Sequence, residues 1–86
     1  MKRVTYSREA LKTLRRIPAN EATRILAKIN QYARDPASLA QNVVKLQGRD
    51  GYRLRIGNWR VIFDEDGTVI DVIDVIDVGA RGGIYD

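Results

Sequence analysis

The sequence contains no cysteine and no histidine, and these two absences exclude several kinds of site. Without cysteine the chain can form neither a disulfide nor a thiolate metal site, which suits a reducing compartment. Without histidine it lacks the side chain that most often binds metals or acts as a general base near neutral pH. Any catalysis must therefore use arginine, lysine, tyrosine or carboxylate groups, and we expect no metal and no other cofactor.

Long apolar runs are also missing. No segment approaches the length that spans a membrane, and the first residues, MKRVTYSREA, lack the apolar stretch of a signal peptide. The length of 86 residues predicts one domain, residues 1–86, with a modest core. We therefore expect a cytoplasmic protein that has no membrane contact and that can depend on a partner.

The charge is unevenly distributed along the chain. The net charge is +4 at pH 7. Residues 1–34 hold nine Lys or Arg against two acids, whereas residues 35–86 hold six against nine. Such an asymmetry favours contact between the first part of the chain and nucleic acid, although a basic helical face can also serve solubility alone.

The clearest local signal is the stretch YRLRIGNWRVIF, residues 52–63. Two runs of alternating apolar and polar residues flank Gly57-Asn58, which is typical of a tight hairpin with a primed turn. With these two residues as the loop, Ile56 faces Trp59, and the pairing continues to both ends of the stretch. One face of the hairpin is then wholly apolar. The other face carries three arginines, which are Arg53, Arg55 and Arg60.

Two of these arginines, Arg55 and Arg60, are predicted to lie directly opposite each other. Like charges in a cross-strand pair destabilise a sheet by a few tenths to about 1 kcal/mol. The simplest interpretation is that the arginines solvate the outer face of a half-buried sheet. We favour an anion site, because guanidinium groups on a rigid sheet match the geometry of phosphate.

A strand and two amphipathic helices are predicted before the hairpin. The strand covers residues 2–6, and Ser7 is a candidate N-cap for a helix over residues 8–17. The apolar positions of this helix are Ala10, Leu11, Leu14 and Ile17. Asn20 is the candidate cap of a second helix over residues 21–34. The two helices form an antiparallel hairpin that would cover the apolar face of the sheet.

Basic side chains lie away from the apolar stripes of both helices and in the connector at residues 36–51. In the connector, Val43, Val44 and Leu46 are able to pack inward. The candidate contacts to nucleic acid are Arg8, Lys12, Arg15, Arg16, Arg24, Lys28, Lys45 and Arg49.

A third strand is predicted to return beside the hairpin. Asp66-Gly67 is typical of a second two-residue turn, which places Ile70 opposite Phe63. The sequence VIDVIDVID at residues 69–77 is a triplet repeat that cannot follow the two-residue period of a strand. An unbulged ladder would place the carboxylate of Asp74 on the apolar face, so we expect a bulge or bend near this residue.

Taken in order, these motifs resemble the RelE/ParE superfamily of bacterial toxins, and its RelE branch in particular. The resemblance covers almost the whole chain and includes K-L-x-G at residues 45–48, the hairpin, and a final V-G-x-R-G-x-x-Y at residues 78–85. It implies an α+β fold, in which an N-terminal strand and an antiparallel helical hairpin pack on a twisted, mostly antiparallel four-stranded sheet.

The resemblance also implies a function. RelE-like toxins of type II toxin-antitoxin systems cut messenger RNA on the ribosome by driving a 2′-hydroxyl onto the adjacent phosphate, and they need no metal. The products are a 2′,3′-cyclic phosphate and a 5′-hydroxyl. The implied partners are a cognate antitoxin, the ribosome and messenger RNA, with operator DNA contacted only through the antitoxin complex.

Five residues match the catalytic positions of the RelE-like family. Arg53, Arg55 and Arg60 are implied to grip the scissile phosphate and to stabilise its developing charge. Arg81 matches the tail arginine that stabilises or protonates the leaving 5′-oxygen. Tyr85 matches the tail tyrosine that acts as general base or stacks on a base, and surrounding arginines would favour its phenolate form.

Two features depart from the family pattern. Many relatives carry His or Lys just before the tail arginine, where this chain has Ala80. The triplet repeat also looks like an expansion of the last strand. Two other functions therefore stay open, which are a ParE-like inhibitor of DNA gyrase without catalytic activity, and a degenerate toxin kept for antitoxin binding.

Overall fold

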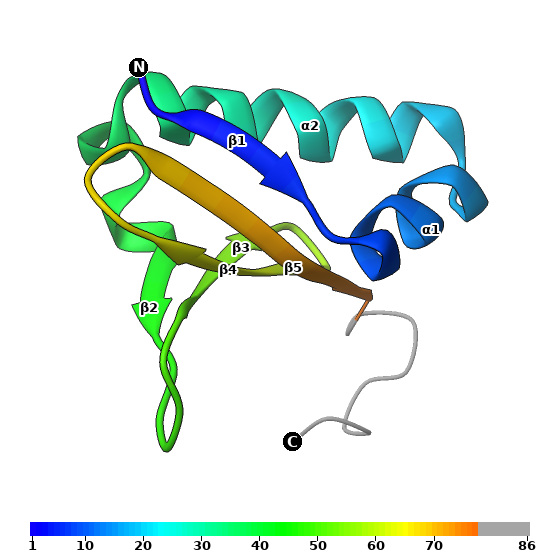
Figure 1. Cartoon of the computed structure of the whole chain (residues 1–86). Coiled ribbons are helices and arrows are strands. Elements are labelled where there is room, and N and C mark those ends of the chain that lie inside the picture. The colour runs from blue at the N-terminus through cyan, green and yellow to red at the C-terminus, as the bar shows by residue number, and fades with distance from the viewer. Residues whose placement is uncertain (78–86) are drawn as a thin grey trace.

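The computed structural model describes residues 1–77 of the chain (Figure 1). A helical layer lies on one side of a twisted sheet, and β1 lies beside β5 although the two are far apart in the sequence. The elements in chain order are β1 (Arg3–Tyr6), α1 (Arg8–Arg16), α2 (Ala19–Arg34), a 3-10 helix (Pro36–Asn42), β2 (Val43–Lys45), β3 (Tyr52–Ile56), β4 (Trp59–Glu65) and β5 (Val69–Asp77).

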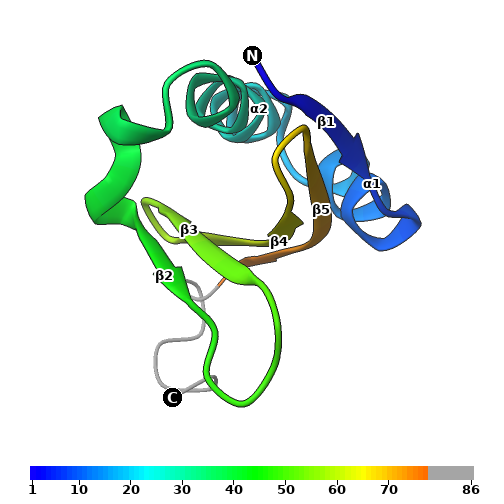
Figure 2. The same ribbon diagram turned by 60° about the vertical axis from the view of Figure 1, so that its left-hand side comes forward.

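The described residues form a sheet of five strands in the order β1-β5-β4-β3-β2. The pair β1 and β5 is parallel, and the other neighbours are antiparallel. Figure 2 shows the sheet curving around α2, with β2 at one edge. The α+β class is as expected, but the expectation of four strands is wrong. The additional strand, β2, is a short segment of the predicted connector that pairs with β3.

The central hairpin has the register that the sequence predicts. Tyr52 pairs with Phe63, Arg55 with Arg60, and Ile56 with Trp59. Gly57 has a φ of 59°. Asn58 does not have a positive φ, because all described residues with a positive φ are glycines. A positive φ at the first loop position alone is typical of a type II′ turn. The apolar face is buried at Leu54, Ile56, Trp59, Val61 and Phe63.

The register of β4 with β5 differs from the prediction by two residues. Ile70 pairs with Glu65 instead of Phe63, because the chain turns one residue later than predicted, over residues 67–68 instead of Asp66-Gly67. The backbone N–H of Asp66 donates to the carbonyl of Val69, and one oxygen of the Asp66 side chain accepts from the N–H groups of Thr68 and Val69, both at 2.8 Å. A shift of two preserves the alternation of faces. Ile70 therefore still points into the core.

The bulge expected near Asp74 is present. The ladder pairs Phe63 with Val72 and then Ile62 with Asp74, so Ile73 has no partner on β4. Asp74 consequently lies on the outer face, and the following Val75 returns to the core. The triplet repeat thus fits the sheet without burying an unpaired carboxylate.

The first helix has the predicted N-cap. The Oγ atom of Ser7 accepts a hydrogen bond from the N–H of Ala10 at 3.0 Å, and the same hydroxyl donates to the carbonyl of Ile73 at the bulge. Leu11 does not join the core, since it is 37% exposed. The prediction for Leu11 was wrong because α1 packs mainly along β5 and presents a narrower buried face, formed by Ala10 and Leu14.

The second helix begins earlier than predicted. It starts at Ala19 after Pro18 and has no side-chain cap, so the prediction that Asn20 caps it is wrong. The carbonyl of Pro18 accepts from the N–H groups of Glu21 and Ala22 instead. Within residues 1–77, no helix is long and apolar enough to cross a membrane.

The connector only partly packs inward. Val43 lies against the core, but Val44 is 50% exposed. The two valines are neighbours on a strand, so their side chains point to opposite faces, and Val44 shares the outer face with its partner Arg53. The expectation that Val44 is buried is therefore wrong.

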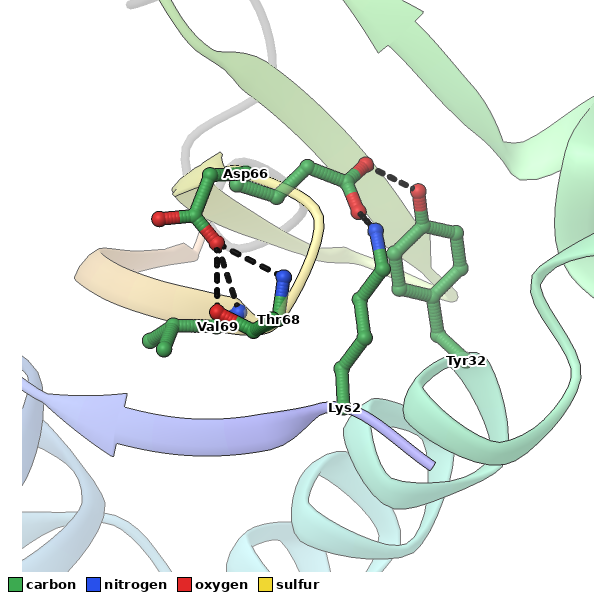
Figure 3. A network of polar contacts seen from close by, with 6 residues as sticks. Lys2, Tyr32, Asp66, Thr68 and Val69 are labelled. Carbon is green, nitrogen blue, oxygen red and sulfur yellow. Dashed lines mark hydrogen bonds and ion pairs between the residues drawn. The ribbon is translucent and has the colours of Figure 1, made fainter.

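A polar network ties the start of the chain to the end of β4 (Figure 3). The phenol of Tyr32 donates to Glu65 Oε1 at 2.6 Å, and the ammonium of Lys2 forms an ion pair with the other carboxylate oxygen. Burial and the neighbouring carboxylate raise the pKa of Tyr32 above its usual value. Tyr32 also packs against Phe63, with ring centroids 5.3 Å apart. The network holds α2 and the N-terminus at the end of the sheet opposite the hairpin turn.

Candidate anion-binding site

The structure brings the three predicted arginines of the hairpin together on the outer face of the sheet. Arg53 pairs with Ile62, and Arg55 pairs directly with Arg60 on the next strand. Arg53 and Arg55 are exposed, whereas Arg60 is half-buried. We call these three residues the arginine face. They alternate along β3 and β4 with the buried residues of the core, so they lie on the opposite face of the same strands.

The charges of the arginine face act on one another. Burial lowers the pKa of Arg60, and the charges of Arg53 and Arg55 lower it further. The Nη1 atom of Arg60 donates to the carbonyls of Gly57 and Trp59, both at 3.1 Å, which fixes its position. Within residues 1–77, no carboxylate lies within 4.0 Å of any of the three guanidinium groups. The cluster is therefore suited to a phosphate that supplies the missing negative charge.

The other end of the outer face is acidic. Asp64 of β4 pairs directly with Asp71 of β5, whose carboxylate accepts a hydrogen bond from Thr5. A hollow of about 390 Å³ lies here and is lined by Thr5, Asp64, Glu65, Asp66, Val69 and Asp71. Charge thus changes sign along β4, from Arg60 to Asp64. A polyanion would be attracted to the hairpin end and repelled from the acidic end.

Arg24 of α2 lies at the turn of the hairpin. If Gly57 carried a Cβ atom, this atom would lie 2.3 Å from Arg24 Nη2, so the guanidinium packs directly on the glycine. Glu21 Oε2 lies 3.7 Å from Arg24 Nη1 and accepts a hydrogen bond of 3.1 Å from Trp59 Nε1. The sequence predicted Arg24 only as part of a basic helical face. Its contact with the turn depends on how α2 crosses the sheet, which no local pattern reveals.

The other predicted basic contacts do not gather at one place. Three of them, Arg8, Lys12 and Arg15, surround the exposed Leu11 on α1 and line a hollow of about 560 Å³. Arg16 is exposed at the end of the same helix, and the ammonium of Lys28 on α2 lies 3.5 Å from Gln31 Oε1. Lys45 and Arg49 are exposed on and after the edge strand β2.

Arg81 and Tyr85 lie outside the described residues. The described chain ends at Asp77, which pairs with Trp59 in β4. The preceding residue, Ile76, pairs with Arg60. The chain therefore leaves the described region at the arginine end of the sheet.

Several solved structures share this fold. The archaeal RelE-RelB complex from Pyrococcus horikoshii OT3 gives a TM-score of 0.75 at 27% identity, covering 91% of this chain and 96% of the other. The RelBE2 toxin-antitoxin complex from Mycobacterium tuberculosis gives 0.73 at 17% identity, with coverages of 88% and 96%. The RelBE complex from E. coli gives 0.70 at 21% identity, with coverages of 87% and 94%. No curated protein matches the chain by sequence.

The fold and the sequence together define the class of protein. A helical pair on a five-stranded sheet with this topology is the fold of RelE toxins, which the solved structures hold in complex with RelB antitoxins. A family model described as the ParE toxin of type II toxin-antitoxin system, parDE, matches residues 4–81. The chain belongs to this family, within the RelE/ParE toxin superfamily.

Proposed function

We propose that this toxin is a ribosome-dependent endonuclease that cuts messenger RNA without a cofactor. The observation that carries the proposal is the arginine face, in which Arg53, Arg55 and Arg60 converge without a carboxylate partner in the described part of the chain. Such a cluster stabilises a phosphate whose charge increases in the transition state. A protein that only binds another protein has no need to hold three like charges together at a cost in stability.

The reaction would be an intramolecular attack within the RNA. The 2′-oxygen forms a bond to the adjacent phosphorus while the bond from phosphorus to the 5′-oxygen breaks, which gives a 2′,3′-cyclic phosphate and a 5′-hydroxyl. The arginine face would bind the nonbridging oxygens. In this proposal Tyr85 takes the proton of the 2′-hydroxyl, and Arg81 stabilises or protonates the leaving oxygen. An arginine serves the second role best as a charge, because its pKa is high.

The proposed partners are a cognate antitoxin, the ribosome and messenger RNA, with operator DNA reached only through the antitoxin complex. The similar solved structures are complexes with RelB antitoxins, which supports an antitoxin partner for this chain. An antitoxin that covers the basic side chains should present acidic residues. The exposed basic residues of α1 and of the β2 edge are proposed to contact phosphates of ribosomal RNA, and this binding should weaken steeply with salt.

Two alternatives have specific support. The matching family is named for the ParE toxin. This match favours the first alternative, a ParE-like inhibitor of DNA gyrase. Ala80 supports a degenerate toxin, since it stands where many relatives carry His or Lys. The triplet expansion gives this second alternative less support, because the bulge at Ile73 absorbs the extra length and leaves the arginine face intact.

The test is induction of the toxin followed by primer-extension mapping of cellular messenger RNA. We expect cuts within translated codons for the natural chain and for Arg34→Ala, an exposed arginine at the far end of α2. We expect none for Arg60→Ala or Arg81→Ala, although both variants should still bind the antitoxin. Growth arrest with intact messages, together with inhibited gyrase supercoiling, would overturn the nuclease in favour of the gyrase inhibitor.

A further inference from the structure

We propose that Arg24 forms a second phosphate-binding position at the tip of the hairpin, adjacent to the arginine face. This inference rests on the proposed function and extends it from the scissile phosphate to its neighbour along the RNA strand. Arg24 would then act in the RNA site itself, separate from the basic residues of α1 that contact the ribosome.

The first observation is the close approach of Arg24 to the turn. A Cβ atom on Gly57 would lie 2.3 Å from Arg24 Nη2, 3.2 Å from Cζ and 3.4 Å from Nη1. The first of these distances is shorter than a real Cβ contact, so a side chain at this position would displace the end of Arg24, and the φ of 59° separately favours glycine. The hairpin turn thus forms a platform on which the guanidinium lies.

The second observation is that Arg24 is held in place but keeps free donors. Its ion pair with Glu21 spans 3.7 Å, and the same carboxylate oxygen is fixed by the indole of Trp59. Among residues 1–77 the guanidinium of Arg24 has no hydrogen-bond acceptor closer than this, and its side chain is 51% exposed. A guanidinium has five N–H donors, so most of them can face a ligand.

The third observation is the distance between this group and the arginine face. Arg60 Nη1 donates to the carbonyl of Gly57 at 3.1 Å, so Arg24 and Arg60 contact the same residue. Their guanidinium groups are therefore less than about 10 Å apart, given the dimensions of one residue. A single strand with a phosphate on Arg60 can place its next phosphate on Arg24 as it passes the tip of the hairpin.

The alternative is that Arg24 has a structural role only and holds α2 against the hairpin. Measuring the affinity of variants for RNA distinguishes this structural role from phosphate binding. The probe is a labelled oligouridylate with 2′-O-methyl groups, which cannot be cut, and its affinity is measured by fluorescence anisotropy over a range of salt concentrations. For Arg24→Ala we expect about a tenfold loss of affinity and a slope of log K against log salt that is smaller by about 0.7, as for one lost phosphate contact on a single strand.

Two variants serve as controls. Arg24→Lys should keep the slope of log K against log salt, because it keeps the positive charge. If Arg24 only held α2 against the hairpin, this variant would lose that contact together with the guanidinium. Arg34→Ala removes the same charge from the other end of α2 and should change neither affinity nor slope. An unchanged affinity and slope for Arg24→Ala would overturn the inference, as would an equal effect of Arg34→Ala.

Gly57→Ala gives an independent test, because the added methyl displaces the guanidinium of Arg24. We expect it to weaken RNA binding in the natural chain and to have little further effect in Arg24→Ala. If the losses of RNA affinity caused by Gly57→Ala and Arg24→Ala were fully additive, the two residues would not act at one phosphate-binding position. If Arg60→Ala abolishes binding and cutting but Arg24→Ala changes neither, the inference fails and the proposed function stands. If the natural chain neither binds the probe nor cuts messages, both fail.

Discussion

Replacing Arg55 with threonine should make the folded protein more stable. Arg55 and Arg60 form a direct cross-strand pair, and neither has a carboxylate within 4.0 Å in the described part of the chain. Two unit charges about 7 Å apart in water repel each other by about 0.6 kcal/mol. A gain of this size corresponds to a rise in Tm of about 2–5 °C for a domain of this length. Threonine is also well suited to a strand.

The assay is urea unfolding at low ionic strength and again in 1 M salt. Lys45→Thr is the control, because it also replaces an exposed cation by threonine on a strand of the sheet but lies outside the arginine face. Arg55→Thr should exceed this control at low salt, and the difference should almost vanish in 1 M salt, where the screening length is about 3 Å. A gain no larger than that of Lys45→Thr at low salt would refute the reasoning that like charges are held together here. The stabilised variant should also lose affinity for RNA.

Three further predictions concern the scaffold. Tyr32→Phe removes a hydrogen bond to Glu65 and should lower the free energy of unfolding by about 1 kcal/mol in urea titrations. Because the pKa of Tyr32 is higher in the folded than in the unfolded chain, its stabilising effect is present below pH 10 and is lost as the pH rises above that value, so the natural chain should lose more stability there than Tyr32→Phe. Hydrogen bonds from Thr68 and Val69 lower the pKa of Asp66, so its contribution is present above about pH 4 and lost below it, and Asp66→Asn should remove this acid dependence in thermal unfolding. Deletion of Ile73 should convert the bulge to a regular ladder with the same core pairs, and a loss of cooperative unfolding by circular dichroism would contradict this.

Local chemistry explains which parts of the fold could be predicted. The hairpin register follows from Gly57-Asn58 and the alternation beside it, and both signals lie within one short stretch. The bulge follows from Asp74, because burying its carboxylate would cost more than breaking the ladder. The register of β5 did not follow, since the turn lies one residue later than predicted, where the side chain of Asp66 accepts hydrogen bonds from two backbone N–H groups. The strand β2 is too short to show a period.

The candidate site divides in the same way. Arg53, Arg55 and Arg60 could be placed on one face because strand periodicity and the turn fix their directions. Arg24 could not be placed, since its position depends on the packing of α2 across the sheet. Two local features agree with the observed position of Arg24. Glu21 lies three residues before it on the same helix face, and the hairpin turn contains a glycine. Neither identifies its partner without the tertiary structure.

The position of α2 links the stability of the fold to the site. The hydrogen bond from Trp59 to Glu21 fixes the first turn of α2 against the start of β4, and the bond from Tyr32 to Glu65 fixes its last turn against the end of the same strand. A strand held at both ends cannot slide under the helix. The position of β4 is therefore fixed, although it carries Arg60 beside another arginine, and no carboxylate among residues 1–77 lies close enough to offset the repulsion between them. An anion that binds from outside would relieve this repulsion, so the arginine pair would add to the selectivity of the proposed phosphate site.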